Sequence, residues 1–184
     1  MHKSEYDNLV AREFKEYSVW HRAMYDGPMA MFKQNDPVSI LDVGCGIGYG
    51  FLSSLREKVP GRYLGIDPDK KSIEYCKKAI GSNDARAFIC GDFLEHDFGK
   101  FDLVFCIEVI EHVEASKRME FLSKVVELAD RAAFISTPDR RKNSHACYTP
   151  REMLRVLRGD CDAHAVAIHR DNTFLYVANK GNPM

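Results

Sequence analysis

Short apolar runs and amphipathic stretches alternate through the middle of the chain. The apolar runs have the length of strands and contain few polar positions, which is typical of strands buried on both faces of a parallel sheet. The stretches between them carry apolar residues three and four positions apart, so each predicts a helix with one face to bury against that sheet. The predicted strands are residues 39–43, 62–66, 85–90, 102–107 and 132–136, and the predicted helices are residues 49–59, 69–80 and 116–128.

This alternation predicts an α/β fold class. Right-handed crossovers between parallel strands place helices on both faces of a doubly wound, Rossmann-like sheet. The last third of the chain changes rhythm, because a predicted helix at residues 150–157 is followed by two extended runs, 163–169 and 173–179. The polar connection Arg170-Asp171-Asn172 predicts a hairpin between those runs. We therefore expect a seven-stranded sheet that is mostly parallel and carries a C-terminal antiparallel hairpin.

Length and composition narrow the classes of function. A chain of 184 residues suits one domain, so we expect residues 1–184 to fold around one core. The net charge of −1 gives no broad attraction to phosphate backbones, so nucleic acid would need a local patch such as Arg140-Arg141-Lys142. No apolar run approaches the ~20 residues of a membrane span, and the N-terminus lacks the apolar core of a secretory signal. Because the six cysteines are also spread singly, we expect reduced thiols and a cytoplasmic protein without a membrane partner.

A glycine-rich loop follows the first predicted strand. Its sequence is Asp42-Val43-Gly44-Cys45-Gly46-Ile47-Gly48, and alternating glycines let a backbone turn sharply and approach a ligand closely. A dinucleotide fingerprint requires glycines at its first, third and sixth positions, but Tyr49 stands at the sixth position counted from Gly44. The spacing therefore disfavours a dinucleotide. A plain tight turn remains the alternative to a ligand-binding loop.

Two further segments extend this pattern in sequence order, Gly65-Ile66-Asp67-Pro68-Asp69 and Cys90-Gly91-Asp92-Phe93. Together with the glycine loop they resemble the class I S-adenosylmethionine-dependent methyltransferases, type 11/12-like, over essentially the whole chain. The resemblance implies that the loop lies under the amino-acid part of the cofactor and that Asp67 accepts hydrogen bonds from the ribose hydroxyls. It also implies that Asp92 lies near the adenine amino group. The implied cofactor-binding residues are Asp42, Gly44, Cys45, Gly46, Gly48, Asp67, Pro68, Asp92, Phe93, Ile107 and Glu108.

The N-terminal region predicts one or two helices over residues 5–32, with an interruption at Asp26-Gly27-Pro28. In the family that the motifs resemble, helices before the first strand often cover the cofactor. We therefore expect residues 1–35 to form a helical segment over the cofactor edge of the sheet.

The segment Glu108-Val109-Ile110-Glu111-His112 ends the fourth predicted strand. If it turns as a helix, positions i, i+3 and i+4 share one face, and Glu108, Glu111 and His112 become a ligand set for Mg²⁺ or Mn²⁺. The segment resembles that of the ubiquinone-pathway O-methyltransferases and of enzymes that methylate the 2′-hydroxyl at the ends of small RNAs, in which it is associated with a divalent metal. The alternative is that Glu108 touches the cofactor or caps a turn while the other two orient neighbouring loops.

The predicted reaction is methyl transfer to an oxygen of a small molecule. A hydroxyl acceptor must lose its proton, and an imidazole with a pKa near ~6.5 suits that task. His112 is the first candidate base and His145 the second. The alternatives are 2′-O-methylation of a nucleic acid or nucleotide-linked acceptor, and a non-catalytic cofactor-binding or interaction module.

Overall fold

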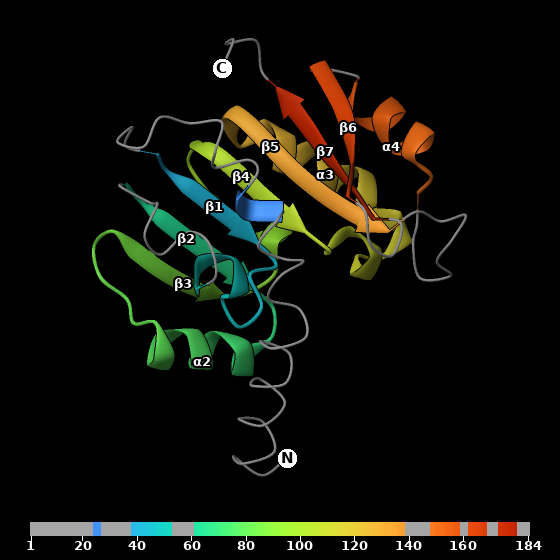
Figure 1. The fold of residues 1–184 in the computed structure, drawn as a ribbon. Coiled ribbons are helices and arrows are strands. Elements are labelled where there is room, and N and C mark those ends of the chain that lie inside the picture. Colours follow the sequence, from blue (N-terminus) through green and yellow to red (C-terminus); the bar gives the residue numbers. More distant parts are fainter. Residues whose placement is uncertain are drawn as a thin grey trace.

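The computed structural model describes residues 24–26, 38–52, 61–138 and 148–158, and the backbone of residues 162–168 and 173–179. Figure 1 shows these elements arranged around one twisted sheet, whose strand order is β3-β2-β1-β4-β5-β7-β6. The strands are β1 (Ile40–Val43), β2 (Tyr63–Asp67), β3 (Arg86–Cys90), β4 (Phe101–Ile107), β5 (Ala129–Pro138), β6 (Asp162–Ile168) and β7 (Thr173–Asn179). The helices are α2 (Lys70–Ala79), α3 (Arg118–Glu127) and α4 (Pro150–Leu157), with 3₁₀ turns η2 (Phe93–Glu95), η3 (Ile110–His112) and η4 (Ala115–Lys117).

Strands β1 to β5 run parallel, which confirms the predicted Rossmann-like α/β arrangement. Val43 at the end of β1 pairs with Ile66 on one side and Cys106 on the other, so the carboxyl ends meet at one edge. The chain reverses its direction of travel across the sheet between β1 and β4, and ligands bind at such switch points. Beyond β5 the backbone of β7 pairs antiparallel with β5, and β6 pairs antiparallel with β7.

The core has two layers because successive residues of a strand point to opposite faces. Leu41 and Val104 face the layer that contains α3 and α4, where Phe121 and Leu157 are buried. The other face packs against α2 and the helical turn at residues 24–26, which Figure 1 shows beside β1 and β4. Strands covered on both faces explain why their sequences are almost continuously apolar.

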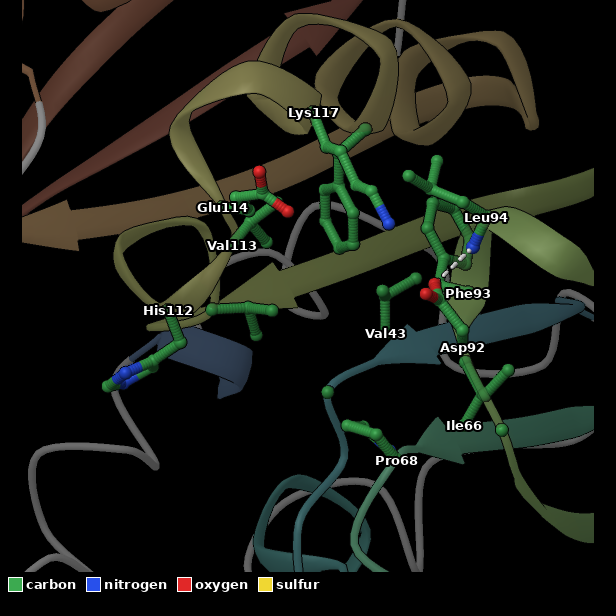
Figure 2. A pocket seen from close by; sticks show the side chains of 14 residues that line it. Val43, Ile66, Pro68, Asp92, Phe93, Leu94, His112, Val113, Glu114 and Lys117 are labelled. Atoms are coloured by element: carbon green, nitrogen blue, oxygen red, sulfur yellow. Dashed lines mark hydrogen bonds between the residues drawn. The ribbon is translucent and has the colours of Figure 1, made fainter.

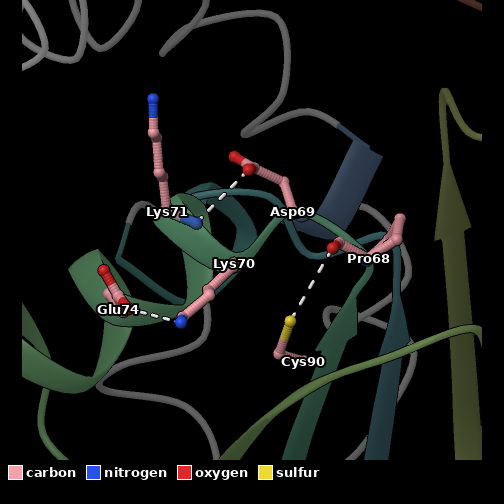
Figure 3. A network of polar contacts seen from close by, with 6 residues as sticks. All are labelled: Pro68, Asp69, Lys70, Lys71, Glu74 and Cys90. Atoms are coloured by element: carbon pink, nitrogen blue, oxygen red, sulfur yellow. Dashed lines mark hydrogen bonds and ion pairs between the residues drawn. The ribbon is translucent and has the colours of Figure 1, made fainter. Parts of the chain in front are cut away.

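Side-chain caps fix the starts of α2 and α4. The Asp69 carboxylate accepts a hydrogen bond from the backbone N–H of Lys71 at 3.2 Å (Figure 3). It accepts a second from the N–H of Ser72 at 3.1 Å, and together these bonds start α2. Thr149 and Glu152 form a capping box at the start of α4. Helix α3 begins at Arg118, two residues later than the predicted helix at 116–128, because η4 precedes it.

Two predicted helical segments lie partly outside the residues that the structure describes. The helix predicted at residues 49–59 is described only to residue 52, and it is helical from Tyr49. Of the predicted N-terminal helical segment only residues 24–26 are described. Cys45, Cys76 and Cys106 are free and buried as expected, whereas Cys90 is free but exposed. No helix in the described part combines the length and apolar content needed to cross a membrane.

Candidate functional site

The glycine loop depends on backbone geometry that side chains resist. Gly44 and Gly46 have φ angles of 70° and 52°, in the left-handed region that favours glycine. A Cβ atom on Gly44 would lie 2.3 Å from Cγ2 of Val109, so this glycine also permits close packing of the segment after β4. A Cβ atom on Gly46 would meet nothing within 4 Å. The loop therefore leaves open space above its middle glycine.

Asp67, at the end of β2, holds this loop in place. Its Oδ2 accepts a hydrogen bond from the Gly46 N–H at 2.9 Å, and its Oδ1 accepts one from the Asp69 N–H at 2.8 Å. Burial raises the pKa of the Asp67 carboxyl, while these two backbone donors oppose that rise. Each oxygen of a carboxylate offers two lone pairs, so one acceptor position on each oxygen remains for a ligand.

Asp42 lies behind the loop and is fully buried. Its carboxylate accepts hydrogen bonds from the hydroxyls of Tyr63 at 2.7 Å and Tyr25 at 3.0 Å. Burial raises the pKa of Asp42 to about 7, and the two tyrosine hydrogen bonds oppose this rise. Both ends of the carboxylate are thus used within the protein. The structure gives Asp42 the role of tying residue 25 and β2 to the loop.

A cavity of about 270 Å³ opens at the carboxyl ends of β1 to β4. Figure 2 shows Asp92, Phe93 and Leu94 on one side of it, with Val113, Glu114 and Lys117 along another. Oδ1 of Asp92 accepts a hydrogen bond from the Leu94 N–H at 2.9 Å, which fixes the carboxylate at the cavity wall. Apolar walls with a few placed polar groups are typical of small-ligand sites. The cavity is lined by Val43, Gly44, Ile66, Pro68, Gly91, Asp92, Phe93, Leu94, Val109, His112, Val113, Glu114, Lys117 and Phe121.

The cavity collects some of the predicted cofactor residues and leaves others out. Gly44, Pro68, Asp92 and Phe93 line it. The other predicted cofactor residues are not among its lining residues: Asp42, Cys45, Gly46, Gly48, Asp67, Ile107 and Glu108. Gly48 approaches α2 instead, where an added Cβ would lie 2.4 Å from Ile80. Sequence reasoning missed the wall residues that belong to the segment after β4. These residues could have been found from their position, because they follow a strand that ends at the same edge as the glycine loop. They are Val109, Val113, Glu114, Lys117 and Phe121.

A second polar group lies at the ends of β4 and β5. Glu108 has a φ angle of 57°, which is costly for a residue with a side chain. Its N–H donates to the Ser136 hydroxyl at 3.0 Å, and that hydroxyl donates to Glu108 Oε1 at 2.8 Å. Ile107 and Ser136 pair across the strands, so register brings these two residues together. Sequence reasoning did not select Ser136, although its place at the next strand end was a signal.

Two buried polar atoms near this turn lack hydrogen-bond partners among the described residues. They are Oε2 of Glu111 and Oγ1 of Thr137. Burial raises the pKa of Glu108 to about 8, and the neighbouring charge of Glu111 adds to that rise. Burial also raises the pKa of Glu111, while its own backbone N–H, the neighbouring His112 charge and the nearby Glu108 and Thr137 side chains oppose that rise. Buried polar atoms in a native fold are satisfied by hydrogen bonds, so a donor group of a ligand can bind these two oxygens.

The predicted metal site is not found. In the part of the chain that the structure describes, no three or more His, Cys, Asp or Glu side chains group as metal ligands. The expected convergence of Glu108, Glu111 and His112 required a continuous helix, but Glu108 turns left-handed and only η3 follows. His112 lines the cavity instead. His145 and the Arg140-Arg141-Lys142 run lie outside the described residues.

Several known proteins have sequences similar to that of this chain. A probable chloroplastic tocopherol O-methyltransferase of Oryza sativa subsp. japonica is 29% identical over 176 residues, which cover 89% of this chain and 48% of the relative. Norajmaline N-methyltransferase of Rauvolfia serpentina is 27% identical over 151 residues, covering 78% of this chain and 49% of the relative. The chain spans about half the length of the curated relatives it matches.

Solved structures share the fold. Magnesium protoporphyrin IX methyltransferase from Synechocystis PCC 6803, with bound SAH, superposes with a TM-score of 0.70 at 16% identity, covering 97% of this chain and 95% of that one. The methyltransferase domain of a bacterial Hen1 gives a TM-score of 0.72 at 18% identity, with coverages of 88% and 98%. The profile of the methyltransferase domain family matches residues 40–131, which is half of the chain. The chain therefore belongs to the methyltransferase domain family, in agreement with the resemblance of its motifs to class I S-adenosylmethionine-dependent methyltransferases.

Proposed function

We propose that this chain binds S-adenosylmethionine in the described cavity and transfers its methyl group to an oxygen of a small molecule. The observation that carries the proposal is the meeting of the glycine loop, Asp67 and Asp92 at one sheet edge, beside a cavity that Gly44 and Asp92 line. Relatives named as O-methyltransferases support the acceptor class. One is the rice protein above, and another is the ubiquinone biosynthesis O-methyltransferase of Actinobacillus pleuropneumoniae, 30% identical over 109 residues.

The residues present fit such a cofactor. Asp67 keeps an acceptor position on each oxygen, which suits the two neighbouring hydroxyls of a ribose. Open space above Gly46 leaves room for a ligand against the loop backbone. Asp92 keeps Oδ2 for an amino donor, since Leu94 occupies Oδ1. When bound, S-adenosylmethionine supplies a methyl group already activated by its sulfonium, so placement of the acceptor accounts for much of the rate.

The acceptor is expected beside the Glu108 turn. A hydroxyl acceptor must give up a proton, and His112 is our first candidate base because it is exposed and lines the cavity. His145 remains the second candidate. The unpartnered Glu111 and Thr137 oxygens nearby could bind a donor group of the acceptor, since a hydroxyl or amine would satisfy them.

Two measurements test the proposal in order. Calorimetry with S-adenosylhomocysteine asks whether the chain binds the cofactor product, and a micromolar Kd is expected. Incubation with methyl-labelled S-adenosylmethionine and matched phenols, alcohols, amines and short RNAs then asks where the label goes. Label on oxygen of a small molecule supports the proposal. Label only on nitrogen or on RNA overturns the acceptor class, and binding without transfer to any acceptor favours a non-catalytic module.

A further inference from the structure

We propose that Lys124 is a positioning residue for the adenosine half of the cofactor site. It does not line the cavity, and the inference rests on the proposed function. Lys124 lies on α3, and its ammonium group reaches the turn that follows β3. That turn carries Asp92, Phe93 and Leu94, three of the residues at the cavity wall.

The ammonium group satisfies three carbonyl oxygens of one short turn. Lys124 Nζ donates to the carbonyls of Phe93 at 2.9 Å, Leu94 at 3.0 Å and His96 at 2.6 Å. A lysine ammonium has three N–H donors, so these bonds use all of them. Because η2 is only three residues long, its carbonyls have no following helical turn to donate to them. Lys124 supplies those donors from another element.

Aromatic rings enclose the same group. Lys124 Nζ lies 5.1 Å from the centroid of the Phe93 ring and 5.7 Å from that of Phe98. Phe93 stacks on Phe98 and contacts Phe121, whose centroid is 4.8 Å away. A cation held over ring faces is attracted by their electrons, and partial exclusion of water strengthens its hydrogen bonds. The lysine is thus fixed on the underside of the turn rather than free to sample solvent.

Leu94 links Lys124 to the cavity wall, because it is hydrogen-bonded to both Lys124 and Asp92. The Leu94 carbonyl is bound by Lys124, and the Leu94 N–H donates to Asp92 Oδ1. Asp92 is exposed, so without this N–H its carboxylate would rotate in water. With it, Oδ2 remains the free acceptor for an exocyclic amino group. Lys124 therefore orients the Asp92 carboxylate through Leu94, without a hydrogen bond of its own to that carboxylate.

The test compares two ligands that differ at that amino group. S-adenosylhomocysteine carries an adenine amine that donates to a carboxylate, and S-inosylhomocysteine carries a carbonyl oxygen there that a carboxylate repels. We expect Lys124→Met to weaken S-adenosylhomocysteine binding about tenfold or more, and S-inosylhomocysteine binding less, so the preference between them shrinks. Lys124→Arg should restore part of the preference because it keeps N–H donors at the same place.

Lys100→Met provides the matched control. Lys100 donates to the Glu127 carbonyl at the far end of α3, and its removal makes the same charge change away from the cavity. This variant should keep the wild-type preference. If Lys124→Met does not fold, Lys124→Gln replaces it and should show the same loss of preference.

Each other outcome has one meaning. Equal weakening of both ligands by the Lys124 variants, with a lower melting temperature, overturns the inference in favour of a purely structural role. Unchanged binding of both ligands overturns it as well. Failure of the wild-type chain to bind S-adenosylhomocysteine overturns the proposed function, and the inference with it.

Discussion

The two halves of the carboxyl edge of the sheet differ in how their polar groups are satisfied. At β1 and β2, the loop N–H of Gly46 and both oxygens of Asp67 are partnered within the protein. At β4 and β5, Glu108 adopts a left-handed turn, and oxygens of Glu111 and Thr137 are buried without described partners. A carboxylate held by two backbone donors presents its remaining acceptor positions in a fixed direction, which suits a cofactor that every turnover needs in the same place. Buried oxygens without a described donor suit a methyl acceptor whose own hydroxyl or amine donates to them.

The largest effect is expected from a substitution in the glycine loop that follows β1. Gly44→Ala places a Cβ in the left-handed region and 2.3 Å from Val109, so we expect a loss of about 3 kcal/mol or more in unfolding free energy. Urea denaturation measures it. Gly99→Ala is the control, because an added Cβ there meets nothing within 4 Å, and it should stay within about 0.5 kcal/mol of wild type. A mild effect of Gly44→Ala would show that the loop tolerates rearrangement.

Asp67→Ala removes the carboxylate that joins the loop to β2. We expect S-adenosylhomocysteine binding to weaken by about 1–3 kcal/mol, because Gly46 and Asp69 N–H groups and the ligand hydroxyls all lose an acceptor. Calorimetry measures the change. Asp130→Ala, at the exposed amino end of β5, removes the same charge far from the loop and should bind normally. Unchanged affinity in Asp67→Ala would contradict the assignment of the ribose site.

Glu108, at the ends of β4 and β5, predicts a dependence of stability on pH with a definite sign. The folded state raises the pKa of Glu108 from 4.5 to about 8, so between these values the folded chain holds more protons than the unfolded chain. The contribution of Glu108 to stability therefore falls as pH rises from about 5 to 8, and Asp42, whose pKa burial raises to about 7, adds a fall in the same direction. Glu108→Gln should remove about 1–2 kcal/mol of that fall, measured by denaturation at both pH values. Glu120→Gln on α3 is an exposed control that should leave the slope unchanged. A slope that Glu108→Gln does not alter would assign the pH dependence to other groups.

The smallest effect sharpens the contrast between partnered and unpartnered hydroxyls. Thr137→Val removes a buried hydroxyl without a described partner, so stability should stay within about 0.5 kcal/mol or rise. Ser136→Ala removes a hydroxyl bonded to Glu108 and should destabilise by about 1 kcal/mol. Thermal denaturation of both variants compares them directly. Comparable losses in the two would mean that Thr137 is already satisfied in the folded chain.

Much of the fold could be predicted because burial on two faces leaves a continuous apolar signature. The helix predicted at 150–157 matches α4 at both ends, and Thr149, Pro150 and Glu152 form the cap that fixes its start. Strand β5 is longer than the predicted 132–136, extending over Ala129–Pro138, because its added ends contain the polar residues Asp130 and Thr137, which an apolar pattern does not detect. Asp67 and Asp92 were found for a similar reason: Asp67 ends β2 and Asp92 lies two residues after β3, so both lie at a shared edge.

The sequence by itself determined the parallel sheet, the glycine loop and the acids at successive strand ends. These depend on local conformation and on the geometry of parallel strands, which residue types report directly. Tertiary structure decided that Asp42 lies behind the loop between two tyrosines. It turned Glu108, which lies beside Glu111, toward Ser136, and no metal-ligand group forms with His112 among the described residues. It also brought Lys124 from α3 to the carbonyls after β3. Such pairings join residues 17 to 31 positions apart, and packing rather than local preference sets them.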